Sequence, residues 1–310
     1  MESLNRNAIE LADEALDFAD ELNVGAYALD NGATVLDFGV DHDGGIEAGL
    51  LLAEIQTAGL ATLNTRLDEV GGAPFTHVEL ATDKPALSLL GSQKAGWEVS
   101  VDGFEGLGSG PARALVAEES EFAEIGYVDA FDLTVLAVES TDLPGDAVAE
   151  HVADLAGIEP SGVYLPTYAT GSVVGSVSMA ARAAEMAVFR LFELGYDPRD
   201  VLSAHGSAPV APVTYDEPTA IGRTNDALAY GGRVHLTVRE DFDRFEELPS
   251  TATEEYGTPF VDIFEDADWD FFEVSESVFA PAKVTVDVVD GPTHVLGGTN
   301  EDLLAESFGL

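Results

Sequence analysis

The segment DLTVLAVE at residues 132–139 opens the stretch that decides the fold class of this chain. It is followed by DAVAEHVADLA at 146–156, GVYLPT at 162–167 and GSVSMAARAAEMAVFRLFEL at 175–194. The first and third segments are short apolar runs typical of strands, and the second and fourth carry apolar residues at helical spacing. Strands that alternate with helices in this way predict an α/β protein.

The alternation continues on both sides of this stretch. A helix is expected over 4–22, then a hairpin from 26–29 to 33–37 that turns at Asn31-Gly32, a pair suited to a type I′ turn. Since the order is not a regular βαβ repeat, we expect mixed sheets. Further strands are predicted at 76–81, 97–101, 233–238, 283–289 and 293–296, and further helices at 47–60, 111–116, 242–248 and 301–308.

The domain organisation is expected to be one unit over 1–310, built of two closely packed α/β subdomains. Gly/Pro-containing breaks at 141–146 and 206–218 are the candidate boundaries between them.

The charge of the chain is extreme. It has 58 Asp plus Glu against 13 Lys plus Arg, a net charge of −45, and only three lysines. A hydrophobic content of 46% argues against disorder, so the acids should coat a folded body. This pattern is typical of proteins that work in concentrated salt, where a Debye length of about 3 Å at ~1 M screens the self-repulsion. Thermal melts in dilute buffer and in molar KCl test this, and equal midpoints would contradict it.

The composition also excludes several classes of function. The negative charge opposes binding to nucleic acid or to anionic lipid. No apolar run reaches the roughly 20 residues of a membrane span and no signal segment opens the chain, so a cytoplasmic protein is expected. The absence of cysteine removes disulfides, thiolate metal sites and a Cys nucleophile, and the six histidines lack metal-ligand spacing. Each histidine is therefore expected to be solvated or structural.

Lysine is scarce enough here to carry information. Lys94 lies inside an uncharged run, Gly91-Ser-Gln-Lys-Ala-Gly-Trp97. A chain that has lost nearly all its ammonium groups is expected to keep this one for a function, whereas a single Asp or Glu in so acidic a chain indicates almost nothing.

A glycine-rich segment, Gly106-Leu-Gly-Ser-Gly-Pro-Ala-Arg113, is a candidate anion seat. Backbone amides and the Ser109 hydroxyl at the start of a helix suit an anion, with Arg113 nearby. It superficially resembles the phosphate loop of GHMP-type small-molecule kinases, which makes an ATP-dependent kinase one alternative. Asp102 stands where that loop has Pro, and Pro111 removes an amide; a structural turn is at least as good an interpretation.

The helix predicted at 175–194 carries an Arg–Glu pair. Arg182 and Glu185 lie three residues apart, on the flank of an apolar stripe. Spacing alone favours an ordinary surface ion pair worth about 0.2–0.5 kcal/mol. Small residues around the pair offer the other interpretation, a ligand held against the helix.

A polar cluster lies in Arg223-Thr-Asn-Asp-Ala-Leu-Ala-Tyr230, bracketed by glycines at 222, 231 and 232. Thr224 and Asn225 there either bind a substrate or cap a helix.

Taken together, these segments resemble the methenyltetrahydromethanopterin cyclohydrolase family. The matching runs keep the family's order from one end of the chain to the other. They are Leu90 to Trp97, Gly108 to Leu115, Gly175 to Val177, Ala181 to Glu185, Gly222 to Arg233, Phe279 to Ala282 and Glu306 to Leu310.

The resemblance implies a cytoplasmic enzyme of two α/β parts with a substrate pocket between them, assembled as a trimer. It would hydrolyse the 5,10-methenyl bridge of a reduced pterin carrier reversibly to the 5-formyl derivative. The carrier is the substrate, and no metal or other cofactor is implied. A pterin-binding protein without activity is a further alternative.

The family's catalytic Arg-x-x-Glu maps onto Arg182 and Glu185, and its pocket lysine onto Lys94. The methenyl carbon is already electrophilic, so the chemistry needs a base for the attacking water; Glu185 is the candidate, and Arg182 would hold it or stabilise oxygen charge. Protonated Glu185 or Lys94 would supply the proton to the departing nitrogen.

The carrier's tail in this family is anionic, and arginines inside the matched runs are the cations available for it. Aromatic side chains, Trp97 among them, are candidates to sandwich the pterin. The substrate-binding candidates are Ser92, Gln93, Ser109, Arg113, Arg223, Thr224, Asn225, Tyr230, Arg233 and Phe279.

Overall fold

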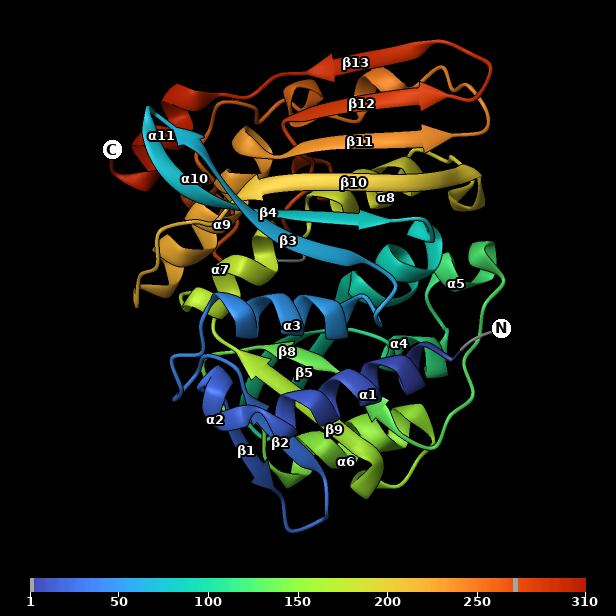
Figure 1. Ribbon diagram of the computed structural model, residues 1–310, viewed down its shortest axis with the longest axis vertical. Coiled ribbons are helices and arrows are strands. Elements are labelled where there is room, and N and C mark those ends of the chain that lie inside the picture. Colours follow the sequence, from blue (N-terminus) through green and yellow to red (C-terminus); the bar gives the residue numbers. More distant parts are fainter. Residues whose placement is uncertain (1–2, 270–272) are drawn as a thin grey trace. The chain divides into compact units, whose positions relative to one another are not determined.

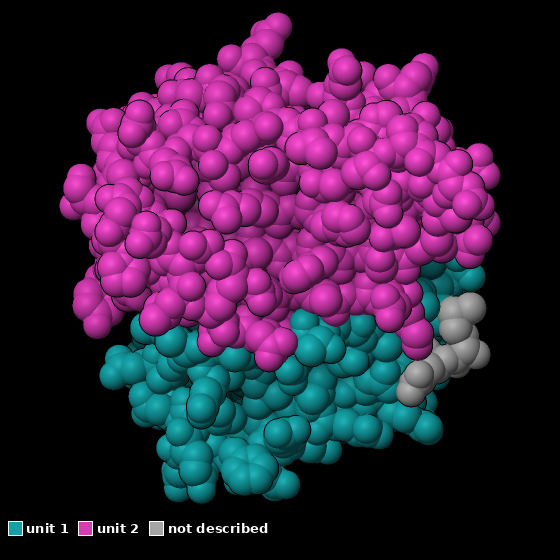
Figure 2. Space-filling model, turned by 45° about the horizontal axis from the view of Figure 1, so that its top comes forward, with its two compact units in different colours: residues 1–62, 87–178 teal, residues 63–86, 179–310 magenta. Residues whose placement is uncertain are grey.

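The chain builds two units, each around its own mixed sheet, as the α/β expectation required (Figure 1). The computed structural model describes residues 3–269 and 273–310. Unit 1 comprises Met1–Thr62 and Leu87–Ser178, and unit 2 comprises Leu63–Ala86 and Met179–Leu310; Figure 2 colours them separately. The breaks expected at 141–146 and 206–218 lie inside unit 1 and unit 2, respectively.

The sheet of unit 1 has seven strands in the order β1-β2-β9-β8-β6-β5, with β7 beside β9. The predicted hairpin is confirmed: β1 and β2 pair antiparallel around Asn31-Gly32. Strand β9 then runs parallel to β2, β7 and β8, while β5 and β6 form an antiparallel hairpin. The bounds are β1 Gly25–Ala28, β2 Thr34–Asp37, β5 Ala95–Val101, β6 Phe104–Ser109, β7 Thr134–Val135, β8 Ala137–Glu139 and β9 Val163–Tyr168.

Helices cover both faces of this sheet. Leu36 of β2 belongs to the core cluster formed with α1 and α3, whereas its neighbour Val35 belongs to the cluster formed with α6. The central strands are therefore apolar at consecutive positions, as strands buried on both sides are. The helices of unit 1 are α1 Leu4–Asp17, α2 Ala19–Leu22, α3 Ile46–Gln56, α4 Ala112–Val116, α5 Ser120–Ile125 and α6 Asp146–Ala156; α7, Val173–Ala180, contains the last passage between the units.

The sheet of unit 2 has six strands in the order β13-β12-β11-β10-β4-β3. Strand β10 pairs antiparallel with β4 and β11, and β11 pairs parallel with β12. The bounds are β3 Thr62–Val70, β4 Ala73–Thr82, β10 Val201–Pro209, β11 Arg233–Val238, β12 Lys283–Val288 and β13 Thr293–Gly297.

One face of this sheet carries the helices. In Figure 1 the strands β10 to β13 lie toward the viewer and α8 lies behind them. Along β11, Val234, Leu236 and Val238 are buried, whereas Arg233 and His235 are exposed. The helices of unit 2 are α8 Ala183–Glu193, α9 Glu217–Gly231, α10 Phe260–Asp266 and α11 Glu301–Phe308, and short 3-10 turns occur at Pro198–Asp200, Phe245–Glu247, Ser250–Ala252 and Glu276–Val278.

Several sequence-based boundaries were wrong. The helix expected over 175–194 is two helices, because α7 ends at Ala180 and α8 begins at Ala183. The strand at 132–139 is interrupted at Leu136, and the helix at 242–248 is a single 3-10 turn. Strands β3 and β10, helix α9 and a π-helix, η1 (Ala86–Gln93), were not predicted at all. Within the described residues, every helix is too short or too polar to cross a membrane.

Candidate functional site

Arg182 and Glu185 form a buried ion pair at the start of α8. Arg182 Nε donates to Glu185 Oε2 at 3.1 Å, and each residue is 5% exposed. Arg182 is the N-cap of α8 and Glu185 lies in its first turn, where the helix dipole favours a carboxylate. The expectation of a surface pair was therefore wrong. Removing one partner of a buried pair leaves the other charge buried and unpaired, which lowers stability by about 3–5 kcal/mol, far more than a surface pair contributes.

The interruption between helices α7 and α8 determines where Arg182 and Glu185 lie. Because α7 stops at Ala180, Arg182 caps a new helix and Glu185 lies in its first turn, whereas in one long helix both would lie in the middle. Gly206 of β10 packs against that turn: a Cβ there would lie 2.6 Å from the backbone nitrogen of Ala184. Glycine thus lets the sheet approach α8 closely and hold the first turn in place. No sequence pattern indicated this contact.

Lys94 lies in unit 1 within a cluster of four charges. Its ammonium forms an ion pair with Glu121 and lies 3.5 Å from Glu119 Oε2. Arg113, fully buried, donates from Nε to Glu119 Oε1 at 2.8 Å and forms a second bond to the same carboxylate. Burial raises the pKa of Glu121, but the charge and hydrogen bond of Lys94, with a contribution from Arg113, outweigh burial and lower it. Two cations therefore face two carboxylates.

The glycine-rich segment is not a phosphate loop. Gly106, Gly108 and Ser109 lie in strand β6, and the helix that follows, α4, has only five residues. Arg113 points into the protein, where its Nη1 donates to the carbonyls of Leu90 and Lys94 at 3.0 and 2.9 Å. The kinase-like interpretation of this segment was wrong. Through these two hydrogen bonds Arg113 links the end of η1 to α4.

Ser92 and Ser109 share a buried partner, Gln56 of α3. Ser92 Oγ donates to the Gln56 carbonyl at 2.6 Å, and Gln56 Nε2 donates to Ser109 Oγ at 3.0 Å. Ser178 Oγ donates to Gln56 Oε1 at 2.9 Å. Gln93 is also fully buried. Sequence reasoning singled out the serines but missed the glutamine that joins them.

The polar cluster on α9 lies in mid-helix. Thr224 Oγ1 and Asn225 Nδ2 donate to carbonyls one turn back on the same helix, so the capping interpretation was wrong. Arg223 Nε donates to the Ser307 carbonyl at 3.0 Å, and Tyr230 Oη donates to the Thr258 carbonyl at 2.6 Å. These contacts fasten α9 to its neighbours; a role of the same residues in substrate binding stays a prediction.

The remaining candidates lie elsewhere in unit 2. Arg233 opens β11 with its side chain 45% exposed, 3.4 Å from Asp68. The centroid of the Phe279 ring lies 5.9 Å from that of Phe260 and 6.3 Å from that of Phe264.

Asp226, next to Asn225 on α9, is a buried carboxyl that the sequence did not indicate. Burial raises its pKa to about 6, although the Ser307 hydroxyl and the Phe260 amide donate to it and lower it; the nearby Asp262 raises it further.

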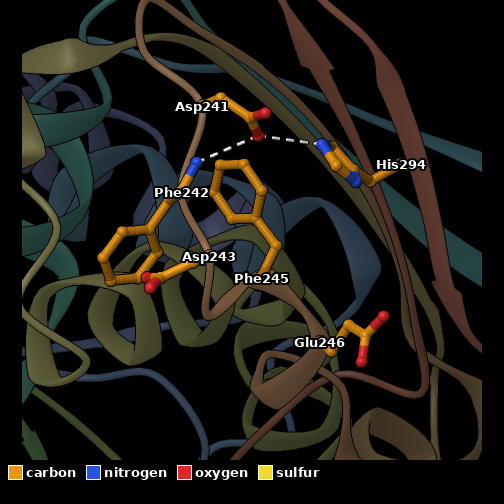
Figure 3. A pocket seen from close by; sticks show the side chains of 6 residues that line it. All are labelled: Asp241, Phe242, Asp243, Phe245, Glu246 and His294. Atoms are coloured by element: carbon orange, nitrogen blue, oxygen red, sulfur yellow. Dashed lines mark hydrogen bonds and ion pairs between the residues drawn. The ribbon is translucent and has the colours of Figure 1, made fainter.

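A hollow of about 310 Å³ on unit 2 is lined by Asp241, Phe242, Asp243, Phe245, Glu246 and His294 (Figure 3). Asp241 Oδ1 is bound to His294 Nε2 at 3.0 Å, as the dashed line in Figure 3 marks. The predicted site residues do not line it. Among residues 3–269 and 273–310, no group of three or more His, Asp or Glu side chains is arranged to hold a metal ion.

Comparison with known proteins decides the family. Residues 3–308 match the family described as Cyclohydrolase (MCH). The chain belongs to the cyclohydrolase family. A methenyltetrahydromethanopterin cyclohydrolase of Halobacterium salinarum is 64% identical over 310 residues, covering all of both chains. Cyclohydrolases of the same name from Methanothermobacter marburgensis and Methanosphaerula palustris are 41% and 40% identical, again over the full length of both.

The family match spans every run on which the resemblance was based. It gives no support to an ATP-dependent kinase or to an inactive pterin-binding protein. The similarity to a halobacterial protein fits the salt-adapted composition.

Proposed function

We propose that this chain catalyses the reversible hydrolysis of the 5,10-methenyl bridge of methenyltetrahydromethanopterin to the 5-formyl derivative. Full-length relatives that carry this activity in their name support the substrate. The observation that carries the mechanism is the buried Arg182–Glu185 pair, a carboxylate fixed in the first turn of a helix by its own N-cap residue.

Glu185 is the base in this proposal. The methenyl carbon bridges two nitrogens as an amidinium cation, so it accepts water without further activation. The water oxygen bonds to that carbon while one of its protons passes to the Glu185 carboxylate, an effect worth about 10²–10⁴ in rate.

Collapse of the adduct completes the reaction. The bond from carbon to the departing nitrogen breaks, and that nitrogen takes the proton from Glu185. The remaining hydroxyl proton leaves to solvent as the formyl C=O forms, so one proton is released per turnover.

Arg182 positions the base. Its Nε hydrogen bond fixes the orientation of the Glu185 carboxylate. Its guanidinium also donates hydrogen bonds that stabilise negative charge on the oxygen of the adduct.

We assign Lys94 the role of a fixed positive charge, and Glu185 rather than Lys94 supplies the proton to the departing nitrogen. Its ammonium is held between the carboxylates of Glu119 and Glu121. Glu121, only 3% exposed, is the residue that positions Lys94. The sequence could not indicate either carboxylate, since both lie among 58 acids.

No metal or nicotinamide takes part in this chemistry, because the substrate carbon is already electrophilic and no electrons are transferred. As the family resemblance implied, we also expect the enzyme to be a cytoplasmic homotrimer.

The test follows the loss of methenyl absorbance in molar KCl, with methenyltetrahydromethanopterin and a methenyl folate offered in turn. Turnover of the methanopterin substrate is the expected result. Failure to hydrolyse either carrier, by protein whose fold is confirmed by circular dichroism, would contradict the proposal.

A further inference from the structure

Gln56 is the last residue of α3, and it is fully buried in unit 1. We propose that Gln56 is a positioning residue, which holds the backbone on both sides of Lys94. The role of Lys94 as a fixed positive charge belongs to the function proposed above, and the role of Gln56 rests on it. Glu121 holds the ammonium group at the end of the lysine side chain, whereas Gln56 sets the place from which that side chain begins.

The polar groups of Gln56 all have partners. Its Nε2 carries two N–H groups, which donate to Ser109 Oγ at 3.0 Å and to Tyr168 Oη at 3.3 Å. Its Oε1 accepts from Ser178 Oγ at 2.9 Å, and its main-chain carbonyl accepts from Ser92 Oγ at 2.6 Å. These partners belong to four elements: Ser92 to η1, Ser109 to β6, Tyr168 to β9 and Ser178 to α7. A fully satisfied buried amide is rigid, so it fixes the elements that it joins.

Two of these partners flank Lys94 in the structure. Ser92 lies two residues before it, and Ser109 pairs across the β5–β6 hairpin with Ala95, the residue after it. The Gly110 amide donates to the Ser92 carbonyl at 2.8 Å, so the end of β6 contacts the chain on both sides of the lysine. Loss of the buried amide therefore loosens the end of β6 and, with it, the backbone that carries the lysine.

The conformation of the chain before Lys94 depends on contacts of this kind. Element η1 is a π-helix, and the Lys94 amide closes its last turn by donating to the Leu89 carbonyl at 2.8 Å. Turns of this type are rare and persist where the surrounding structure holds them, mostly at functional sites. Here the surroundings are Gln56 and Arg113, whose Nη1 donates to the carbonyls of Leu90 and Lys94.

A second buried amide in unit 1 allows a matched comparison. Asn5 of α1 is also fully buried, and its Nδ2 donates to the Pro111 carbonyl and to Asp129 Oδ2, both at 2.9 Å. Its Oδ1 accepts from Thr134 at 2.6 Å, and all three partners lie outside residues 92–95. Gln56→Met and Asn5→Leu each replace an amide by an apolar side chain of similar size. Both should lose stability in urea, but only Gln56→Met should disturb Lys94.

The first experiment does not depend on enzymatic activity. The lysines of the folded chain are acetylated with an N-hydroxysuccinimide ester in molar KCl, and the rate at each lysine is measured by mass spectrometry. In wild type and in Asn5→Leu, Lys94, whose side chain is 16% exposed, should react more slowly than the exposed Lys84 and Lys283. Its rate relative to these two should rise severalfold in Gln56→Met. A ratio that stays at the wild-type value in Gln56→Met would overturn the proposal, whatever the substrate of the enzyme.

The second experiment measures turnover of methenyltetrahydromethanopterin in molar KCl. In Gln56→Met, kcat/KM should fall by about 10–10²-fold, because small displacements at a site have effects of this size. Asn5→Leu should keep the wild-type value. Ser109→Ala removes the bond to β6 alone, so it should change both readouts in the same direction by less, and it decides the matter if Gln56→Met does not fold. Equal kcat/KM in the Gln56 and Asn5 variants would contradict the proposal. A wild type without turnover would instead contradict the proposed function, and the acetylation rates would still test the role of Gln56.

Discussion

The two sheets of this protein have similar sizes but different environments. The sheet of unit 1 has helices on both faces, and its central strands β2 and β9 are apolar at successive positions, such as Val35 and Leu36. The sheet of unit 2 has helices on one face, and β11 and β12 alternate between exposed polar and buried apolar residues. The spacing of apolar residues along a strand therefore indicates whether one or both faces of the sheet are covered.

The buried carboxyls of the two units differ as well. Asp37 of unit 1 is fully buried, and it accepts hydrogen bonds from four backbone amides and from His42. Asp226 of unit 2 accepts bonds from one amide and one hydroxyl. Hydrogen bonds therefore offset the cost of burying the ionised carboxylate of Asp37, whereas they offset little of that cost at Asp226.

The largest effect should come from truncating strand side chains. Leu36→Ala and Leu165→Ala remove side chains from opposite faces of the first sheet, and each should destabilise the protein by about 2–5 kcal/mol. In the second sheet Leu236→Ala should have a similar effect, but its neighbour His235→Ala should stay within about 0.5 kcal/mol. Denaturation in urea at high salt measures all four, and equal losses at 235 and 236 would contradict the one-faced description of unit 2.

The next effect is a pH dependence of opposite sign in the two units. The pKa of Asp226 is raised to about 6, so its contribution to stability is complete below pH 4 and is lost as the pH rises through 6, a loss of about 3 kcal/mol. Burial raises the pKa of Asp37, but His42 and the amides of residues 39–41 outweigh it and lower the pKa, so Asp37 stabilises the fold above pH 4 and less as the pH falls.

Stability measured between pH 2 and 7 checks this difference, because the change at Asp37 falls below pH 4 and the change at Asp226 falls between pH 4 and 7. Relative to wild type, Asp226→Asn should gain stability as the pH rises, while Asp37→Asn should lose it. The same trend for both variants would show that their carboxyls are not compensated differently.

A smaller effect is expected at the contact between β10 and α8. Gly206→Ala places a Cβ 2.6 Å from the Ala184 nitrogen, so strand or helix must shift, at about 1–3 kcal/mol. Turnover should also fall, because the same turn carries Glu185. Gly298→Ala in the same unit meets nothing within 4 Å and is the control. Unchanged stability and turnover in Gly206→Ala would show that this contact does not position the base.

Much of the fold could be predicted from the sequence. The hairpin at Asn31-Gly32, helix 146–156 and strand 233–238 all have strong local signals, and all three were confirmed. Strand β10 was missed because Ser, Ala, Gly and Pro residues make up most of it, and α9 because its Thr-Asn-Asp run resembles a loop. In both elements tertiary packing overrides local preference.

The candidate site was predictable in part. Family motifs supplied Arg182, Glu185 and Lys94, but their environment depends on contacts distant in sequence. The break after Ala180 and the approach of Gly206 turn an apparent surface pair into a buried one. The carboxylates that hold Lys94 lie 25 and 27 residues further along the chain and leave no pattern in spacing.

In the proposed mechanism the buried Glu185, held by Arg182, deprotonates the water that attacks the substrate. The most direct test compares Glu185→Gln with Glu247→Gln, since Arg244 and Glu247 form an Arg–Glu pair of the same spacing that is exposed. With methenyltetrahydromethanopterin in molar KCl, kcat should fall by about 10²–10⁴ in Glu185→Gln and stay at the wild-type value in Glu247→Gln. A Glu185→Gln enzyme that folds and turns over at the wild-type rate would contradict the claim.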